Sequence, residues 1–351
     1  MSVTDDSADP IVSVLLEENI PALAQALGSG WDINRELRLS QYSSMTPVNL
    51  ALCYDKQQLL DFLLERKADL NARIDPPIIW AIGNNCPLPI LEKLIAHGAR
   101  LDRVNQVGTN AYLAALYAKR FELLGEIFRL GLAIDADGGQ ALRSAAFARQ
   151  FEAVKFFIEH GHDPNAHVPD MVFPDNPTAV SIAARNGDIE MVTYLVAHGA
   201  DITLSNEYGD RPYTHALKAK HVELQEYLKA REPVEWHTDE YHLRRMAEHR
   251  VPPALIEFLR GTERRIALEG CYPKYIEFHT LAHVKEVAWQ GDKLLDLLAE
   301  VDDFWETGYL VWSRRHSKVA HADYEHGHFT VLCTWQNFIA KPSKWISRLG
   351  S

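Results

Sequence analysis

The stretch TAVSIAARNGDIEMVTYLVAHGADIT, residues 178–203, decides the fold of the first part of this chain. It contains two short apolar segments with helical spacing, separated by a turn at Asn186 and Gly187 and closed by Gly199. Apolar residues three and four positions apart form one face of a helix, and a glycine can end a helix with a positive φ at no steric cost. The stretch therefore predicts a pair of short helices.

The same pattern recurs through the first two thirds of the chain, with a period near 33 residues. A small alanine marks each copy, and intervals of 30, 33, 31, 38 and 33 residues separate Ala51, Ala81, Ala114, Ala145, Ala183 and Ala216. The glycine that ends the second helix recurs as Gly98, Gly131 and Gly161, whereas Lys67 holds this position in the second copy, where we expect strain. Insertions at residues 35–44 and 167–177 interrupt the period. Six copies in register predict a repeat protein.

The repeat resembles the ankyrin repeat over residues 10–231. The residues that carry the resemblance are Gly199, Ala200 and Asp201, the TP pair Thr46 and Pro47, Thr109, Thr178, and Gly187 in ARNGDIEMVTYLV. The resemblance implies an α-solenoid of about seven units, each with a β-turn finger and two antiparallel helices, and with a degenerate capping unit at residues 10–34. It also implies a protein partner, bound on the face that carries the fingers.

Residues 232–351 lack this period and hold six of the eight Trp residues. VEWHTDEYHLRRMAEH (234–249) predicts a helical, packed junction, and VPPALIEFLRG (251–261) a short helix that stops at Gly261. YIEFHTLAHVKEV predicts a strand that turns into a helix at Thr280. WETGYLVWS, KVAHADYE and HFTVLC predict strands, and a last helix follows the cap Thr334. This order predicts a smaller α+β domain.

This second pattern resembles the SUKH superfamily. The apolar positions, one glycine and an acidic bend that carry the resemblance are Pro252, Leu255, Ile256, Phe258, Ile276, Phe278, Asp302, Asp303, Gly308, Tyr309, Val311, Trp312 and Phe338. The resemblance implies a mostly non-catalytic domain that serves bacteria as an immunity protein against contact-delivered toxins.

The sequence contains no strong motif for a catalytic, phosphate-binding or metal-binding site. There is no GxSxG or glycine-rich phosphate loop, and the four Cys residues are far apart. The segment HSKVAHADYEHGH offers one metal-site alternative, in which His321, Asp323 and His328 converge on a hairpin; a solvated hairpin face is the other reading. We expect no enzyme activity, no metal and no cofactor.

Charge points to the kind of partner. The net charge of −12 disfavours nucleic acid, and the first 231 residues carry 30 acidic against 21 basic side chains. Acidic and aromatic residues gather in the 167–177 insertion and the next finger, where we predict a partner-binding surface of Asp170, Phe173, Asp175, Glu207, Tyr208 and Asp210. The alternative is that acidic fingers only keep the solenoid soluble.

Together these features predict a cytoplasmic immunity protein, or antitoxin, that inhibits a basic toxin. It would have no chemistry of its own and would act away from any membrane. A nuclease is the kind of toxin that such an acidic inhibitor suits. The alternatives are a non-catalytic ankyrin scaffold or host-directed adaptor, and an enzyme with its site around His321.

Overall fold

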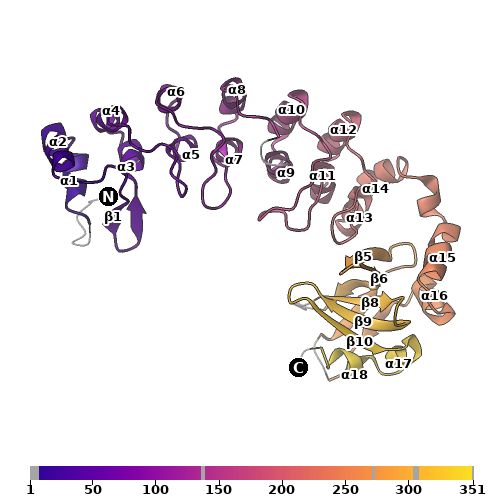
Figure 1. Cartoon of the computed structure of the whole chain (residues 1–351). Helices are drawn as coiled ribbons and strands as arrows, with labels where there is room; N and C mark the ends of the chain where they lie inside the picture. Colours follow the sequence, from indigo (N-terminus) through magenta and orange to yellow (C-terminus); the bar gives the residue numbers. More distant parts are fainter. Residues whose placement is uncertain (1–7, 136–138, 271–272, 303–307, 350–351) are drawn as a thin grey trace. The chain divides into compact units, whose positions relative to one another are not determined.

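The computed structural model describes residues 8–135, 139–270, 273–302 and 308–349 (Figure 1). The chain forms two compact units, Met1–Asp163 and Pro164–Ser351. The boundary between the units falls inside the repeat region of the sequence, so the first unit holds the earlier repeats and the second holds the later repeats together with the C-terminal region. The division predicted at residue 231 follows the sequence pattern and stays a prediction.

Helix pairs follow one another along the described part of the first unit. Their bounds are α1 Ile11–Leu16, α2 Ile20–Gly28, α3 Pro47–Cys53, α4 Gln57–Glu65, α5 Pro77–Gly83, α6 Leu88–Ala96, α7 Ala111–Tyr117, α8 Glu122–Arg129, α9 Gln140–Phe147 and α10 Phe151–Glu159. The insertion at 35–44 contributes an antiparallel hairpin, β1 Leu37–Ser40 with β2 Ser43–Met45. The sequence indicated an insertion there but not a hairpin.

Caps and small residues explain the helix pairs. The Thr46 hydroxyl accepts a hydrogen bond from the backbone N–H of Asn49, and the Asn110 side chain does the same for Leu113. Such caps satisfy donors that the first turn leaves unpaired. Ala81 is fully buried and Ala114 is 4% exposed, which lets successive inner helices approach closely. The recurring alanine is therefore a packing requirement of the repeat.

The glycine positions also behave as the pattern predicts. Gly98, Gly131 and Gly161 have φ between +91° and +99°, and Lys67 takes the same left-handed conformation with φ +57°. A second left-handed residue, which the sequence did not reveal, lies between the two helices of each repeat. In the first unit these residues are Glu18, Asp55, Asn85, Lys119 and Arg149.

The second unit continues with two helix pairs, α11 Ala179–Asn186 with α12 Ile189–Ala197, and α13 Pro212–Lys218 with α14 Val222–Lys229. A 3-10 turn, η1 Val234–His237, and helices α15 Asp239–Glu248 and α16 Pro253–Arg260 come next. The junction is helical, as predicted, because Thr238 caps α15 and the side chains of His242 and Met246 are buried.

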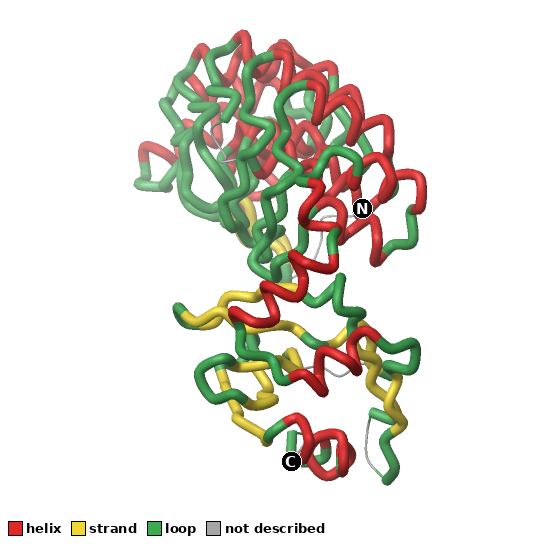
Figure 2. Tube along the Cα trace, turned by 90° about the vertical axis from the view of Figure 1, so that its right-hand side faces the viewer, coloured by secondary structure: helices red, strands yellow, loops and turns green. Residues whose placement is uncertain are grey.

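Two antiparallel sheets form the C-terminal region, where Figure 2 shows the strands gathered. One has the strand order β10-β9-β8-β6-β5 and the other the order β3-β4-β7. The strands are β3 Arg265–Ala267, β4 Tyr275–Phe278, β5 Lys285–Trp289, β6 Asp292–Asp296, β7 Leu298–Val301, β8 Tyr309–Ser313, β9 Lys318–Asp323 and β10 His328–Cys333. Helices α17 Trp335–Ala340 and α18 Pro342–Ile346 close the chain.

One large core joins the helices to the strands, and a smaller apolar cluster lies among β5, β6, β8 and β9. Leu255, Ile276, Phe278, Trp312 and Phe338 are all at most 2% exposed and belong to one apolar cluster. The α+β organisation expected from the sequence is therefore present. Any α+β domain buries such positions, so their burial does not by itself identify a superfamily.

Two local expectations were wrong. No helix begins at Thr280: residues 281–283 form a turn and the chain enters β5, where inward side chains alternate with outward ones. The last helix is broken at Lys341, because Pro342 starts a new helix and disfavours a helical residue before it. Within the described part of the chain, no helix has the length and apolar character needed to cross a membrane.

Candidate protein-binding surface

The inserted segment 167–177 in the second unit is a loop that is anchored by one buried side chain. An oxygen of Asp170 accepts hydrogen bonds from the backbone N–H groups of Val172 and Phe173, each at 2.7 Å. Phe173 is buried at 4% exposure, whereas Met171 is 82% exposed and Val172 49%. The loop therefore presents two apolar side chains to solvent beside an acidic residue.

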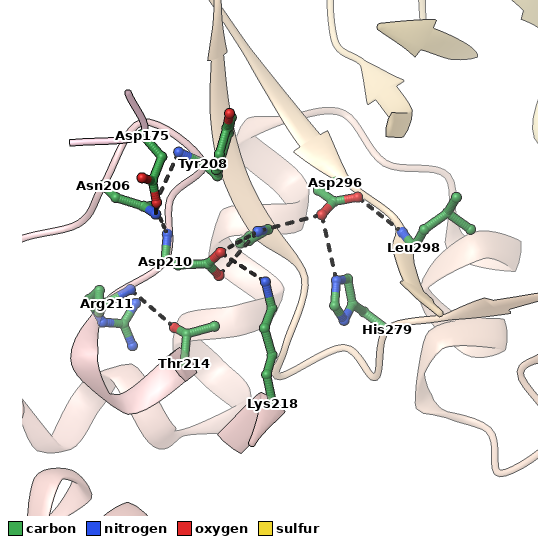
Figure 3. Close-up of polar contacts among 11 residues, drawn as sticks. Asp175, Asn206, Tyr208, Asp210, Arg211, Thr214, Lys218, His279, Asp296 and Leu298 are labelled. Atoms are coloured by element: carbon green, nitrogen blue, oxygen red, sulfur yellow. Dashed lines mark hydrogen bonds and ion pairs between the residues drawn. The ribbon is translucent and has the colours of Figure 1, made fainter. Parts of the chain in front are cut away.

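The next finger is tied to this loop through Asn206. Its amide oxygen accepts hydrogen bonds from the N–H groups of Tyr208 and Asp210, at 3.1 and 2.8 Å, and its amide nitrogen donates to Asp175 at 3.1 Å (Figure 3). The N–H of Glu207 also donates to the carbonyl oxygen of Asp175 at 3.0 Å. Two successive fingers thus form one ordered surface, as expected when an Asn side chain replaces backbone partners in a turn.

Asp210 points away from that surface into a buried charge network. Its carboxylate accepts from the Lys285 ammonium at 3.0 and 3.1 Å and from Lys218 at 2.8 Å. Lys285 lies 3.8 Å from Asp296, whose side chain is 2% exposed and 3.7 Å from His279 (Figure 3). The network joins the last repeat to strands β5 and β6 within the second unit.

Burial and charge act in opposite directions on this network. Burial alone would raise the pKa of Asp210, but the neighbouring Lys285 and Lys218 outweigh it and lower the pKa. Burial lowers the pKa of Lys285 against the opposing effect of Asp210 and Asp296. The nearby His215 is buried, and burial lowers its pKa to about 4. His215 is therefore neutral at neutral pH, and the carboxylates and ammonium groups hold the charge.

Tyr208 packs against the C-terminal sheet. Its ring centroid lies 6.0 Å from that of Tyr309 and 6.2 Å from that of Tyr324, and the Tyr324 hydroxyl donates to the carbonyl oxygen of Ala288 at 2.6 Å. Burial raises the pKa of Tyr324 to about 12. Aromatic pairs at these separations stabilise an interface beyond the area they bury.

The predicted surface is thus only partly external. Phe173 and Asp210 were wrongly expected to face a partner: one anchors its own loop, and the other is neutralised by lysines of the same chain. Asp170, Asp175, Glu207 and Tyr208 retain exposure, with Glu207 the most open of them. The sequence missed Lys285, although its position in phase with the buried Val287 and Trp289 marks an inward-facing lysine that needs a partner.

A second exposed apolar surface lies in the first unit. A groove of 310 Å³ runs between α5, α7 and the adjoining fingers, lined in part by Ile79, Trp80 and Tyr117. Tyr117 is 57% exposed, and outside the groove lining Val104 and Val107 of the adjoining finger are 48% and 56% exposed. An exposed aromatic side chain in a groove with further exposed apolar residues nearby is typical of a binding surface.

The metal alternative finds no support in the C-terminal hairpin. His328 is paired in register with Asp323 across β9 and β10, but His321 and Asp323 are both buried. Asp323 accepts from the N–H groups of Glu325 and His326 and contacts the His326 ring at 3.0 Å, so it stabilises the hairpin turn. The described residues contain no cluster of three or more potential metal ligands.

The fold and the surfaces define a helical-repeat protein of the kind that binds other proteins. A family model for ankyrin repeats (3 copies) matches residues 167–235. The chain therefore carries ankyrin repeats, and these indicate protein–protein interaction.

Three relatives agree with this assignment. The chain is 24% identical over 235 residues to the ankyrin repeat and KH domain-containing protein mask-1 of Caenorhabditis elegans, covering 65% of this chain and 9% of that protein. It is 22% identical over 229 residues to an ankyrin repeat protein of Acanthamoeba polyphaga mimivirus, covering 64% and 29%. An ankyrin repeat domain-containing protein of Stachybotrys chartarum is 25% identical over 175 residues, covering 49% and 8%. The chain thus spans less than a third of the length of each.

Proposed function

We propose that this chain is a cytoplasmic, non-catalytic immunity protein that binds a secreted toxin through its ankyrin repeats and blocks the toxin. The observation that carries the proposal is the surface formed by the 167–177 loop and the next finger, which we call the loop–finger surface. It combines the exposed Met171 and Val172 with the acidic side chains of Asp170, Asp175 and Glu207.

This chemistry suits a basic protein. Exposed apolar side chains supply buried contact area in a complex, and surrounding carboxylates raise the association rate with a positively charged partner. The hydrogen bonds of Asp170 and Asn206 hold the two loops in place before binding, which lowers the entropy lost in the complex. A toxin with a basic active-site face, such as a nuclease, is the partner we favour.

The C-terminal region supports the loop–finger surface in this proposal. The contacts of Tyr208 with Tyr309 and of Asp210 with Lys285 hold the finger against the C-terminal sheet. We infer that this region is a SUKH-like domain with no catalytic step. The described Cys53, Cys86 and Cys333 are free thiols, in keeping with a reducing compartment.

Co-expression tests the proposal. Cells that express a secreted toxin encoded beside this gene should survive when they also express the chain, and the two proteins should co-purify. The Met171→Asp and Glu207→Lys variants should each weaken the complex at least about tenfold, since one loses an apolar anchor and the other reverses a charge. Glu223→Lys, an equal charge change on the exposed face of α14, serves as the control. Absence of both protection and binding for every neighbouring toxin would overturn the proposal.

The groove of the first unit favours a second candidate, a general ankyrin scaffold or host-directed adaptor. The relatives found are ankyrin repeat proteins of an animal, a virus and a fungus. In that case the Trp80→Ala and Tyr117→Ala variants should lose the partner, and a pull-down should recover a protein that is not a toxin. Binding that depends on Met171 but not on Trp80 would favour the immunity function.

A further inference from the structure

The second unit contains a pocket whose charge is opposite to that of the chain as a whole. The pocket has a volume of 430 Å³ and lies among the last finger, α15 and β5. Five of its lining side chains are Lys or Arg and two are Glu; the cationic ones are Arg211, Arg244, Arg245, Lys285 and Lys293. A chain with a net charge of −12 therefore places an excess of positive charge in one cavity.

Three of these cations already have carboxylate partners. Arg211 forms a two-point ion pair with Glu232, at 2.8 and 3.2 Å, and Lys285 is held by Asp210. Lys293 lies 2.7 Å from Glu286, which also accepts from His249. The Glu286 carboxylate of the pocket is therefore committed to its own neighbours.

Arg244 and Arg245 differ from the other three. Among the described residues, neither guanidinium forms an ion pair with a carboxylate. Arg245 donates one hydrogen bond to the carbonyl oxygen of Val284, while its Nε is shielded from solvent and has no partner in the described structure. Burial lowers the pKa of Arg245, and the Tyr241 hydroxyl and the more distant Glu286 oppose the shift.

A buried guanidinium without a counter-charge is costly, because the protein interior solvates the charge poorly. A second donor-capable group close by is also unsatisfied: His242 is 5% exposed and its Nδ1 has no partner among the described residues. Thr203, Ser205 and Tyr213 add hydroxyl groups to the lining. The pocket thus offers unused polar atoms on Arg245 and His242, and the acid of its lining that is left over, Glu248, is exposed to solvent.

We propose that this pocket binds the phosphate group of a small phosphorylated molecule, with Arg245 and Arg244 as its principal ligands. The planar guanidinium group matches two phosphate oxygens at once, and partial burial strengthens the contact. The cavity is large enough for a ligand bigger than phosphate alone. Trp236 and Tyr241 line the same wall, with ring centroids 6.5 Å apart, and provide apolar area for the rest of the ligand.

Isothermal titration of the full chain with inorganic phosphate, and separately with AMP, tests the proposal. We expect saturable binding of at least one probe at concentrations up to about 10 mM, well within the range of a weak specific site. Arg245→Gln should weaken this binding at least about tenfold, and Arg244→Gln should weaken it by a smaller factor. Arg66→Gln, which removes an exposed guanidinium at the end of α4, should leave it unchanged.

A structural role for Arg245 predicts a different result. In that case Arg245→Gln would lower the melting temperature but leave the phosphate-induced rise in melting temperature intact. If Arg245→Gln does not fold, the exposed Arg244→Gln variant decides the question by the same titration. The proposal is refuted if neither probe binds saturably, or if binding is equal in the wild type and both pocket variants.

Discussion

Replacement of Lys285 by Met should strongly destabilise the second unit. The Lys285 ammonium is buried, with its side chain 7% exposed, and it is the group that links Asp210 to Asp296. The variant leaves Asp210 with Lys218 at 2.8 Å but leaves Asp296 without a lysine. Asp296 then keeps the N–H of Leu298 at 3.1 Å and the His279 ring at 3.7 Å.

The magnitude follows from this arrangement. Removing one partner of a buried ion pair costs about 3–5 kcal/mol, chiefly because the remaining charge is poorly solvated. Lys218 still neutralises Asp210, so we expect the lower end of that range, about 3 kcal/mol. The Met side chain fills the volume of the lysine stem and adds no large cavity term.

Urea denaturation monitored by tryptophan fluorescence measures this change. Six of the eight Trp residues follow residue 231, so the signal reports mainly the second unit. Lys293→Met is the matched control: it removes the same charge from a neighbouring strand, but its side chain is 74% exposed, and such pairs contribute less than about 1 kcal/mol.

A double-mutant cycle isolates the pair itself. The Lys285→Met and Asp210→Asn changes should together cost at least about 1 kcal/mol less than the sum of their separate effects, because both remove the same interaction. Equal destabilisation by Lys285→Met and Lys293→Met, or strict additivity in the cycle, would refute the buried network as a source of stability.

Three further predictions, made with four substitutions, test other parts of the structure. Burial lowers the pKa of His215 to about 4 in the folded chain, against 6.5 for an unperturbed histidine, so the stability that the neutral ring contributes is present above pH 6.5 and falls as the pH drops towards 4. The free energy of unfolding should fall by about 2 kcal/mol between about pH 7.5 and pH 5. Urea midpoints measured over this range should show a smaller fall for His215→Gln. Lys67→Gly should stabilise the first unit by about 0.5–1 kcal/mol through relief of its positive φ, whereas Gly98→Ala should destabilise it by a similar amount; a shared sign in calorimetry would contradict the reasoning. Gly209→Ala should destabilise the second unit by more than about 2 kcal/mol, because a Cβ there would clash with the carbonyl oxygen of Glu286 and φ is +71°; an unchanged melting temperature would show that the finger does not need this close approach.

The helix pairs were predictable from sequence because their determinants are local. The spacing of apolar residues, the Thr46 cap and the glycine at Gly98 all act within one repeat, so each repeat shows the same signals. The left-handed residue between the helices was missed because it has no fixed identity: it is Asp55 in one repeat and Lys119 in another.

The C-terminal strands were harder to predict. β8 and β10 are rich in β-branched and aromatic residues, whereas β6, with the sequence DKLLD, resembles part of a helix. Its strand state is fixed by pairing with β5 and β8, which the sequence of β6 alone does not encode.

The candidate surface shows the limit of counting charges along a sequence. Asp210 and Glu207 are three positions apart and contribute equally to an acidic count, yet Glu207 is exposed and Asp210 is neutralised by a lysine 75 residues away. The same count hides the cationic pocket, because Arg211, Arg245 and Lys285 come from different elements of the fold. Net charge therefore indicates the sign of a long-range field, whereas the sign of a particular site depends on which charges the fold has already paired.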